Sequence, residues 1–393
     1  MITTFIIVAT LLLIIVAFVT IDNDLRILKE KDYHGAIQHS AFMRLMDKIF
    51  NDFFEWNRWK KILAVSFIVL VALVLTGLLV VRFAFPRVPA LPAISINHGD
   101  SALLKRGAYL VESVAICTDC HSPRDVNVFS WPVIEEKKGA GAAFLSRKAG
   151  FPIFPGESFT PNITPAHLGN WTDAELYRLL TTGIRKDGTT ANHAMPFESF
   201  SQADPDDLKA IIAYIRTLQP VNAEPAGTTE TMLLHSLYNR IISRKVRPVY
   251  LRDLKTAVDS GRYLVNLASC NDCHTPKKWI EINDESRKLS GGIEFPMPTG
   301  GFVHSANLTP DESGLGNWTA ETFVNRFKSY TDSAALFTVE PGKLNSLMPW
   351  GVYRHMTEQD LRNIFAYLQT LKPVYNPVTK FTAEKIEKKK TEQ

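Results

Sequence analysis

All four cysteines of this 393-residue chain lie in two copies of one short pattern. Residues 117–123 read "CTDCHSP" and residues 270–276 read "CNDCHTP", so each copy has two cysteines three positions apart and a histidine directly after the second. The interval of 153 residues between the copies recurs between "AMPF" and "LMPW", and between "IIAYIRTLQPV" and "IFAYLQTLKPV". A repeat of this length predicts two homologous units in tandem, each folded around its own cysteine pattern.

Both repeats are predicted to be mainly helical. "SALLKRGAYLVESVA" and "LKTAVDSGRYLVNLA" lead into the cysteine patterns as helices, and "TDAELYRLLTTGI" and "TAETFVNRFKSY" begin with a threonine in a capping position. "DPDDLKAIIAYIRTL" and "TEQDLRNIFAYLQTL" close each repeat with a helix whose first turn is acidic, as the helix dipole favours. We expect Tyr109 to pack with Tyr214, and Tyr263 with Tyr367, where the first and last helices cross.

C-x-x-C-H is the attachment signature of c-type haem. The two thiols add across the vinyl groups of the porphyrin, and the histidine that follows them binds the iron from one face. The pattern therefore predicts two covalently bound haem c groups. Their attachment residues are Cys117, Cys120 and His121 in the first copy, and Cys270, Cys273 and His274 in the second.

A six-coordinate haem iron needs a second axial ligand from a distant part of the chain, and methionine is a common choice. Met195 and Met348 each precede a proline, upstream of the closing helix and at equivalent positions of the two repeats. We expect them to bind the irons opposite His121 and His274.

Trp171 and Trp318 occupy equivalent "GNWT" segments of the two repeats. Each indole can cover an edge of the haem or donate its N–H to a propionate. Each can instead pack at the start of the helix that follows, and the sequence does not separate these roles.

Two other uses of the cysteines have to be weighed. A zinc site made of all four cysteines would bring the two patterns together across the repeats. A thioredoxin-like redox pair would require a βαβ context, which the helical pattern does not provide. The matched methionines favour haem over both. The net charge of +4, with no basic block that contains interleaved aromatic residues, gives no support to nucleic-acid binding.

The first 87 residues are predicted to anchor the chain in a membrane. Residues 3–21 form an apolar run long enough to cross a bilayer as a helix, and a second helix is expected over residues 62–85. A cleaved signal peptide is the alternative for the first run, but that run has no basic region before it and no A-x-A-like exit.

Residues 22–61, between the two runs, contain eight lysines and arginines and an apolar stripe at helical spacing. The positive charge predicts that this segment is cytoplasmic. The stripe predicts an amphipathic helix, which lies either in the membrane lipid surface or against a partner subunit. Both repeats then face the periplasm of a bacterium, where haem c is attached, and the chain crosses the inner (cytoplasmic) membrane twice.

The second repeat, "GRYLV…CNDCHTP…NLTPD…GLGNWT…MPW…LRNIFAYLQTLKPV", closely resembles the cytochrome c subunits of membrane-bound alcohol, gluconate and aldehyde dehydrogenases. The first repeat matches as well, and the resemblance covers residues 100–377. It implies that each repeat is a class I cytochrome c fold with a His/Met-ligated haem. The family usually has three haems and a signal peptide, whereas this chain has two C-x-x-C-H patterns and two apolar runs. Residues 328–350 also replace the loop that precedes the methionine in the first repeat.

The expected fold is mainly α, with two N-terminal transmembrane helices followed by two tandem class I cytochrome c domains. The expected parts are a membrane anchor (1–87), a first domain (97–222), a linker helix (223–250), a second domain (251–377) and a polar tail (378–393).

The expected function is electron relay at the periplasmic face, as a non-catalytic subunit of a respiratory complex. The donor would be a dehydrogenase or quinol-oxidising complex, and the acceptor a terminal oxidase or a soluble cytochrome c. The alternative is a dihaem peroxidase-like enzyme, which needs one iron with an exchangeable ligand. The insertion before Met348 is the one feature that hints at it.

Overall fold

The structure is a computed structural model that describes residues 57–84, 90–146, 157–192, 194–223, 254–279, 282–330 and 337–383. The chain divides into two compact units, of which the first ends at Leu79 and the second begins at Val80. The first predicted span (3–21), almost all of the predicted amphipathic segment (22–61) and all but the first residue of the linker helix (223–250) lie outside the described residues.

Helix α3 (Arg58–Ala84) covers the second predicted span. Its 27 residues give a length of about 40 Å, which exceeds the hydrocarbon thickness of a bilayer. The most apolar 18-residue window within residues 58–78 has a mean hydropathy of 2.5, and none of that window is buried inside the protein. Large apolar side chains such as Leu63 and Phe67 are two-thirds exposed. A helix of this length and composition can cross a membrane, and it is the one candidate span among the described residues.

The second unit begins with the elements of the first repeat. They are α4 (Ser101–Tyr109), the single π-helical turn η1 (Leu110–Val114), α5 (Cys117–Cys120), the 3₁₀ turn η2 (Glu135–Lys137), β1 (Ala142–Ser146), β2 (Glu157–Thr160), α6 (Pro165–Leu168), α7 (Asp173–Thr182), α8 (Phe197–Phe200) and α9 (Pro205–Ile215). β1 and β2 pair antiparallel, with Ala142 opposite Thr160.

The second repeat has the same order of helices among its described residues, except that α6 and the π-helical turn have no counterpart. Its elements are α11 (Ala257–Leu267), α12 (Cys270–His274), β3 (Lys277–Trp279), β4 (Ile282–Asn283), η4 (Glu285–Arg287), β5 (Glu294–Pro296), β6 (Phe302–His304), α13 (Ala320–Lys328), α14 (Trp350–Tyr353), α15 (Glu358–Leu368) and β7 (Phe381–Thr382). β3 pairs antiparallel with β4, and β6 lies between β5 and β7 in a small antiparallel sheet. The segment expected as a polar tail from residue 378 thus begins by adding a strand to the second repeat.

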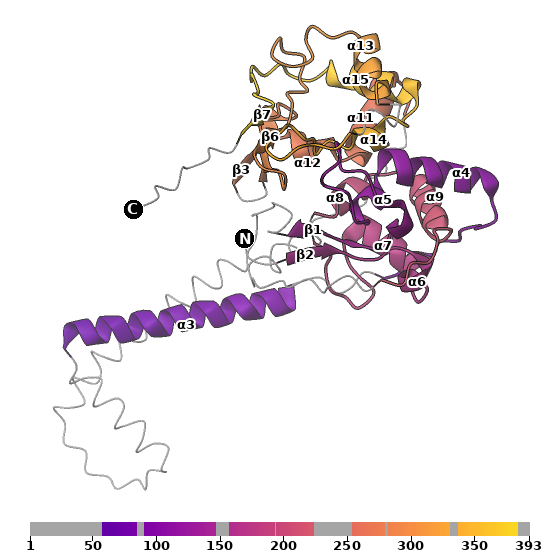
Figure 1. Ribbon diagram of the computed structural model, residues 1–393. Coiled ribbons are helices and arrows are strands. Elements are labelled where there is room, and N and C mark those ends of the chain that lie inside the picture. Colours follow the sequence, from indigo (N-terminus) through magenta and orange to yellow (C-terminus); the bar gives the residue numbers. More distant parts are fainter. Residues whose placement is uncertain are drawn as a thin grey trace, which may run out of the picture. The chain divides into compact units, whose positions relative to one another are not determined.

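In each repeat the first and last helices cross at a glycine. α4 packs against α9, and α11 packs against α15 (Figure 1). A Cβ atom at Gly107 would lie 2.0 Å from the Ala210 carbonyl oxygen, and one at Gly261 would lie 1.8 Å from the Asn363 carbonyl oxygen. Such contacts are far shorter than any real Cβ contact, so only glycine lets the two backbones approach this closely.

The predicted helix starts are confirmed. Thr172 caps α7 in a full capping box with Glu175, and Thr319 caps α13 through the Thr322 N–H. The first turns of α9 and α15 contain two acidic residues each. These signals are local, which is why the sequence alone located the helices.

A reciprocal pair of tyrosines joins the two repeats. The Tyr109 hydroxyl donates a hydrogen bond to the Asp360 carboxylate of the second repeat, and the Tyr263 hydroxyl donates to Asp207 of the first at 2.6 Å. Each hydroxyl also accepts a hydrogen bond from the backbone N–H at the N-cap of the helix that carries its carboxylate. Because the same positions exchange contacts in both directions, the repeats are related by an approximate two-fold axis.

The predicted tyrosine packing is therefore confirmed only in part. Tyr214 and Tyr367 lie at the helix crossings, where their Cβ atoms are 2.8 and 2.9 Å from the Cβ positions that the two glycines lack. Tyr109 and Tyr263 instead reach across to the other repeat. Buried side chains of both repeats form one continuous apolar cluster, the shared core, which includes Leu110, Leu208 and Leu264.

Candidate haem sites

A left-handed residue turns the chain from the first helix of each repeat into the cysteine pattern. Ile116 has φ 47° directly before Cys117, and Ser269 has φ 53° directly before Cys270. This conformation costs a non-glycine residue about 1–2 kcal/mol, and most of all a β-branched one. Both repeats have this unfavourable conformation at the same position. The turn brings Cys117 of α5 into the shared core and Cys270 of α12 against it.

Each pattern histidine has its tautomer fixed by a backbone carbonyl. The His121 Nδ1 lies 2.7 Å from the Pro161 carbonyl oxygen, and the His274 Nδ1 lies 2.8 Å from that of Ala306. A carbonyl only accepts hydrogen bonds, so Nδ1 carries the proton and donates it, which leaves the Nε2 lone pair available for a metal. Burial lowers the pKa of both imidazoles, which favours the neutral form that a metal ligand requires.

An Asn-x-Thr segment holds each of these carbonyls in place. Asn162, next to Pro161, accepts hydrogen bonds from the backbone and the hydroxyl of Thr164, at 2.8 Å each, and donates to the Val221 carbonyl beyond the closing helix. Asn307 and Thr309 repeat this arrangement in the second repeat. In both repeats, the segment that provides the carbonyl bound by the imidazole is therefore hydrogen-bonded to the chain just after the closing helix.

A glycine donates a hydrogen bond to the backbone carbonyl of each pattern histidine. The N–H of Gly141 donates to the His121 carbonyl and that of Gly291 donates to the His274 carbonyl, both at 2.7 Å. Both glycines have positive φ, and a Cβ at Gly291 would lie 2.3 Å from the Ala306 carbonyl oxygen. No side chain fits between the histidine and its carbonyl partner. Together with the fixed tautomers, this donor set fits a haem iron.

The four cysteines are free, so the disulfide that paired cysteines could form is not present. Burial raises the pKa of the Cys117 and Cys270 thiols to about 12, so both are neutral near pH 7. No group of three or more His, Cys, Asp or Glu side chains in the described parts of the chain could hold a metal ion, which gives no support to the four-cysteine zinc alternative.

The two cysteine patterns lie near one another. Burial is the main cause that raises the pKa of Cys120 to about 12, and Cys273 of the other pattern contributes to the same shift. Tyr353 lies between the patterns: its hydroxyl donates to the Ala268 carbonyl at 3.0 Å, and burial, with smaller contributions from thiols of both patterns, raises its pKa.

Met195 and Met348 occupy matched places. Each lies two residues before a short helix, α8 or α14, and each is partly buried against the shared core, which contains Cys117 and against which Cys270 also packs. Asn192, three residues before the first methionine, accepts a hydrogen bond from the Met195 N–H through its backbone carbonyl at 2.9 Å. The structure thus brings the predicted methionines to the same core as the cysteine patterns.

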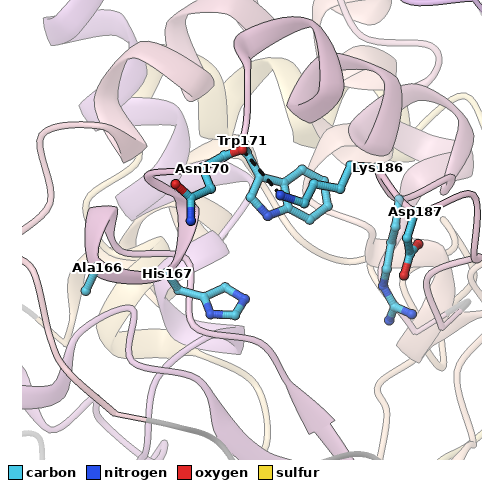
Figure 2. Close-up of a pocket in the computed structure, with 7 residues that line it drawn as sticks. Ala166, His167, Asn170, Trp171, Lys186 and Asp187 are labelled. Carbon is cyan, nitrogen blue, oxygen red and sulfur yellow. Dashed lines mark hydrogen bonds between the residues drawn. The ribbon is translucent and has the colours of Figure 1, made fainter.

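Trp171 lines an open cavity of about 410 Å³ whose rim carries two cations, Arg185 and Lys186, and one acidic residue, Asp187 (Figure 2). The Lys186 Nζ lies 5.7 Å from the centre of the indole and donates to the Asn170 carbonyl at 3.3 Å. Arg185 and His167 line the same cavity. The two cations suit a carboxylate such as a propionate, although Asp187 offsets part of their charge, and the capping box beside Trp171 equally suits a role at the start of α7.

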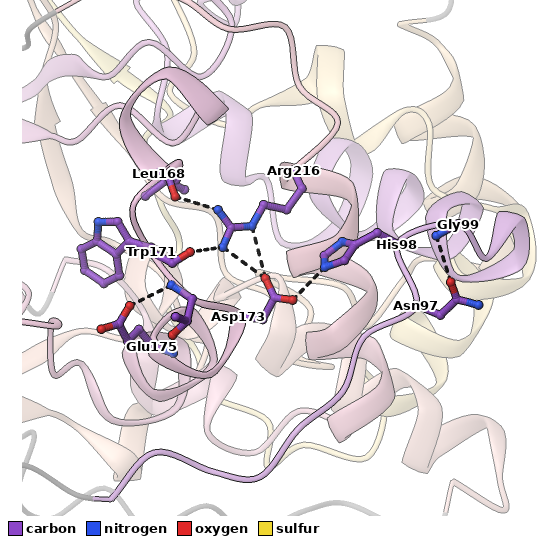
Figure 3. A network of polar contacts seen from close by, with 9 residues as sticks. Asn97, His98, Gly99, Leu168, Trp171, Asp173, Glu175 and Arg216 are labelled. Carbon is purple, nitrogen blue, oxygen red and sulfur yellow. Dashed lines mark hydrogen bonds and ion pairs between the residues drawn. The ribbon is translucent and has the colours of Figure 1, made fainter.

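Arg216, after the closing helix, holds the Trp171 segment (Figure 3). Its guanidinium donates to the Leu168 carbonyl at 2.7 Å, to the Trp171 carbonyl, and to the Asp173 carboxylate at 3.1 Å. The second carboxylate oxygen of Asp173 lies 2.7 Å from the His98 Nε2. One partly buried cation therefore fixes three groups that no short motif of the sequence connects.

Sequence reasoning did not identify the carbonyl partners, the two glycines or the Asn-x-Thr segments as parts of these sites. A signal was present, because "PNITP" and "ANLTP" recur at equivalent places of the repeat.

A search against protein-family models gives no match. Curated relatives do match. The chain is 28% identical over 290 residues to the cytochrome c subunit of the quinone alcohol dehydrogenase of Gluconacetobacter polyoxogenes, and this match covers 70% of the chain and 57% of the relative. It is 26% identical over 296 residues to the gluconate 2-dehydrogenase cytochrome c subunit of Pantoea cypripedii, covering 71% and 62%. It is 26% identical over 266 residues to a dihaem c-type cytochrome of Cereibacter sphaeroides, covering 64% and 81%.

The chain thus spans less than two thirds of the length of the dehydrogenase subunits it matches. The resemblance drawn from the two C-x-x-C-H repeats is confirmed: this chain is similar to the cytochrome c subunits of alcohol, fructose and gluconate dehydrogenases and to a dihaem cytochrome c.

Proposed function

We propose that this chain is a membrane-anchored dihaem c-type cytochrome that relays electrons as a subunit of a respiratory complex. The observation that carries the proposal is the pair of histidines, each next to two free cysteines and each with Nδ1 bonded to a carbonyl. The haems would be bound covalently through Cys117, Cys120, Cys270 and Cys273. The iron ligands would be His121 with Met195, and His274 with Met348.

A c-type haem supplies one-electron transfer at an iron whose potential a methionine ligand raises. The chain supplies orientation. The carbonyls of Pro161 and Ala306 hold each imidazole in one tautomer and one ring orientation, and a hydrogen-bonded imidazole is also a stronger ligand. A methionine on the opposite face would leave both irons closed to substrate, which suits a relay rather than an enzyme.

Transfer between the two haems is supported by the position of the cysteine patterns. Cys120 and Cys273 lie close enough for one to affect the titration of the other. Cys120 would hold one haem and Cys273 the other, so each haem would be attached at a segment that lies near the other segment.

The proposed location is the periplasmic face of a bacterial inner membrane, with two passes through the lipid. Helix α3 supports the second pass. The proposed donor is a dehydrogenase, as the names of the relatives suggest, or a quinol-oxidising complex. The proposed acceptor is a terminal oxidase or a soluble cytochrome c.

The test is to produce the full chain in a bacterium that attaches haem c and to purify it in detergent. The intact mass should exceed that of the chain by two haem groups, and replacing Cys270 and Cys273 by alanine should remove one of them. The oxidised protein should be low-spin, with a thioether-to-iron charge-transfer band from both haems. A colourless protein would refute the proposal, and a high-spin signal from one haem would favour the peroxidase-like alternative.

A further inference from the structure

The two methionine loops are supported in different ways. In the first repeat, residues 184–190 form a small hairpin closed by an Ile184–Thr190 bridge, and the Ala191 N–H donates to the Gly183 carbonyl at 2.7 Å. These contacts stay inside the first repeat. In the second repeat, the residues before Met348 bind a loop of the first repeat, residues 126–131.

Asn345 is the centre of this contact. It is fully buried, and its amide Nδ2 donates to the Val126 and Val128 carbonyls at 3.1 and 3.4 Å. Its Oδ1 accepts from the Ser130 N–H at 3.1 Å and from the Ser346 N–H at 2.7 Å. One side chain therefore satisfies backbone groups of both repeats, and removing it would leave several of them buried without a partner.

Ser130 makes the direct contact with the methionine. Its buried hydroxyl donates to the Met348 carbonyl at 2.8 Å. The Ser346 hydroxyl lies 3.4 Å from the same carbonyl and accepts a hydrogen bond from the Trp350 indole at 3.1 Å. The backbone of the residue expected to bind the second iron is thus held by a side chain of the other repeat.

Backbone pairing and aromatic stacking extend the contact. The Phe129 N–H donates to the Phe337 carbonyl at 2.8 Å, and the Val339 N–H donates to the Asn127 carbonyl at 2.7 Å. The Phe129 ring stacks on Phe337 at 5.3 Å and on Tyr330 at 5.8 Å. Residues 127–129 of the loop therefore pair antiparallel with residues 337–339 of the second repeat, through a single bridge between Val128 and Thr338.

The 126–131 loop adopts a costly conformation to make these contacts. Ser130 and Trp131 both have positive φ, 65° and 50°, which is rare for a bulky residue such as tryptophan. Trp131 is buried against Met297 and Val303 of the second repeat, in a cluster that Leu347 also contacts. Strain of this kind persists where the surrounding contacts determine the backbone, and it concentrates at functional sites.

We propose that the 126–131 loop of the first repeat is a clamp that positions Met348 as the ligand of the second haem. The inference rests on the proposed function, because it assumes that Met348 binds an iron. The ligand of the second iron then depends on the docking of the two repeats through the loop that precedes it, whereas the loop that precedes Met195 is closed by contacts inside its own repeat. Ser130 and Asn345 are positioning residues in this scheme, and neither touches the haem iron.

The test is displacement of the methionines by imidazole in the oxidised full-length protein, followed through the thioether-to-iron band. The band should disappear in two phases, and Met348→Ala identifies the phase of the second haem by its absence. Ser130→Ala should increase the affinity of the second haem for imidazole about fivefold, because the net contribution of one ordinary hydrogen bond corresponds to about this factor in an equilibrium constant. Asn345→Ala should increase it more than tenfold, and both variants should lower the reduction potential of that haem.

Ser201→Ala is the matched control, because its buried hydroxyl also donates to a backbone carbonyl, that of Glu198 at 2.6 Å, without contact to either Met348 or the clamp. It should leave the Met348 phase unchanged. If Asn345→Ala does not fold, Ser130→Ala alone decides. Equal shifts of both phases, or no shift of the Met348 phase, would overturn the clamp. A wild-type protein that has haem but no thioether band would refute methionine ligation itself, and the clamp with it.

Discussion

Ser269 shows how a single residue serves the site at the expense of stability. It lies directly before Cys270 with φ 53°, and its hydroxyl is buried without a hydrogen-bond partner among the described residues. Glycine would adopt this conformation without the cost of a side chain. Ser269 thus adopts a left-handed backbone conformation that serine does not favour.

Ser269→Gly is therefore expected to stabilise the protein by about 1 kcal/mol, since the relief of the left-handed conformation and of the unpaired hydroxyl outweighs the added freedom of the unfolded chain. Thermal unfolding followed by circular dichroism would measure it. Ser260→Gly is the control, because the same change inside helix α11 should lower stability by about 0.5 kcal/mol. A lower melting temperature for Ser269→Gly would contradict the reasoning.

At the scale of helices and strands, local signals were sufficient for much of the fold. The capping threonines and the acidic first turns located α7, α13, α9 and α15, because capping and dipole effects act within a few residues. The clamp loop could not be predicted in this way. Its bonds to Asn345 join residues more than two hundred positions apart, in a stretch without helical or strand periodicity.

The helix crossings give a prediction at the same scale. Gly261→Ala would add a Cβ atom 1.8 Å from the Asn363 carbonyl oxygen, so α11 and α15 would have to separate. Alanine gains about 1 kcal/mol of helix propensity over glycine, but overpacking of a tight contact costs about 1–3 kcal/mol, and this contact is far below van der Waals distance. We expect a net loss of stability, visible as a lower melting temperature.

Gly99→Ala is the control for this change, because the nearest atom to a Cβ at Gly99 is 3.5 Å away. Its melting temperature should match that of the wild type. Equal melting temperatures for Gly261→Ala and Gly99→Ala would show that α11 and α15 do not cross at this glycine.

At the scale of the whole second unit, the sequence predicted a tandem repeat but not how the two copies contact each other. The repeat pattern predicts Tyr109 and Tyr263 at the helix crossings, because the pattern alone does not say which face of a helix meets the other copy. The structure shows that both hydroxyls bind carboxylates across the approximate two-fold axis. These contacts form only between the two repeats, so the sequence pattern of a single repeat does not predict them.

These tyrosines make the docking of the repeats sensitive to high pH. Burial, followed by the hydrogen bond to Asp360, raises the pKa of Tyr109 to about 12. Burial, followed by the negative charge of Asp207 and the hydrogen bond to it, also raises the pKa of Tyr263. The folded protein therefore binds each phenolic proton more tightly than the unfolded chain does, whose tyrosine pKa is about 10. Their contribution to stability is complete below about pH 10 and is lost as the pH rises through the folded pKa.

Tyr109→Phe should lower the stability by about 1–3 kcal/mol near pH 8, because it removes a hydrogen bond to a charged group, and it should flatten the fall of stability above pH 10. Melting temperatures measured from pH 8 to 12 would test both effects. Tyr375→Phe, at a tyrosine that is 68% exposed, should leave the curve of the wild type unchanged. If the curves of Tyr109→Phe and wild type run parallel up to pH 12, the phenolic proton does not contribute to docking. In that case the reciprocal tyrosines only fill space between the repeats, and the contact around Asn345 must account for their orientation.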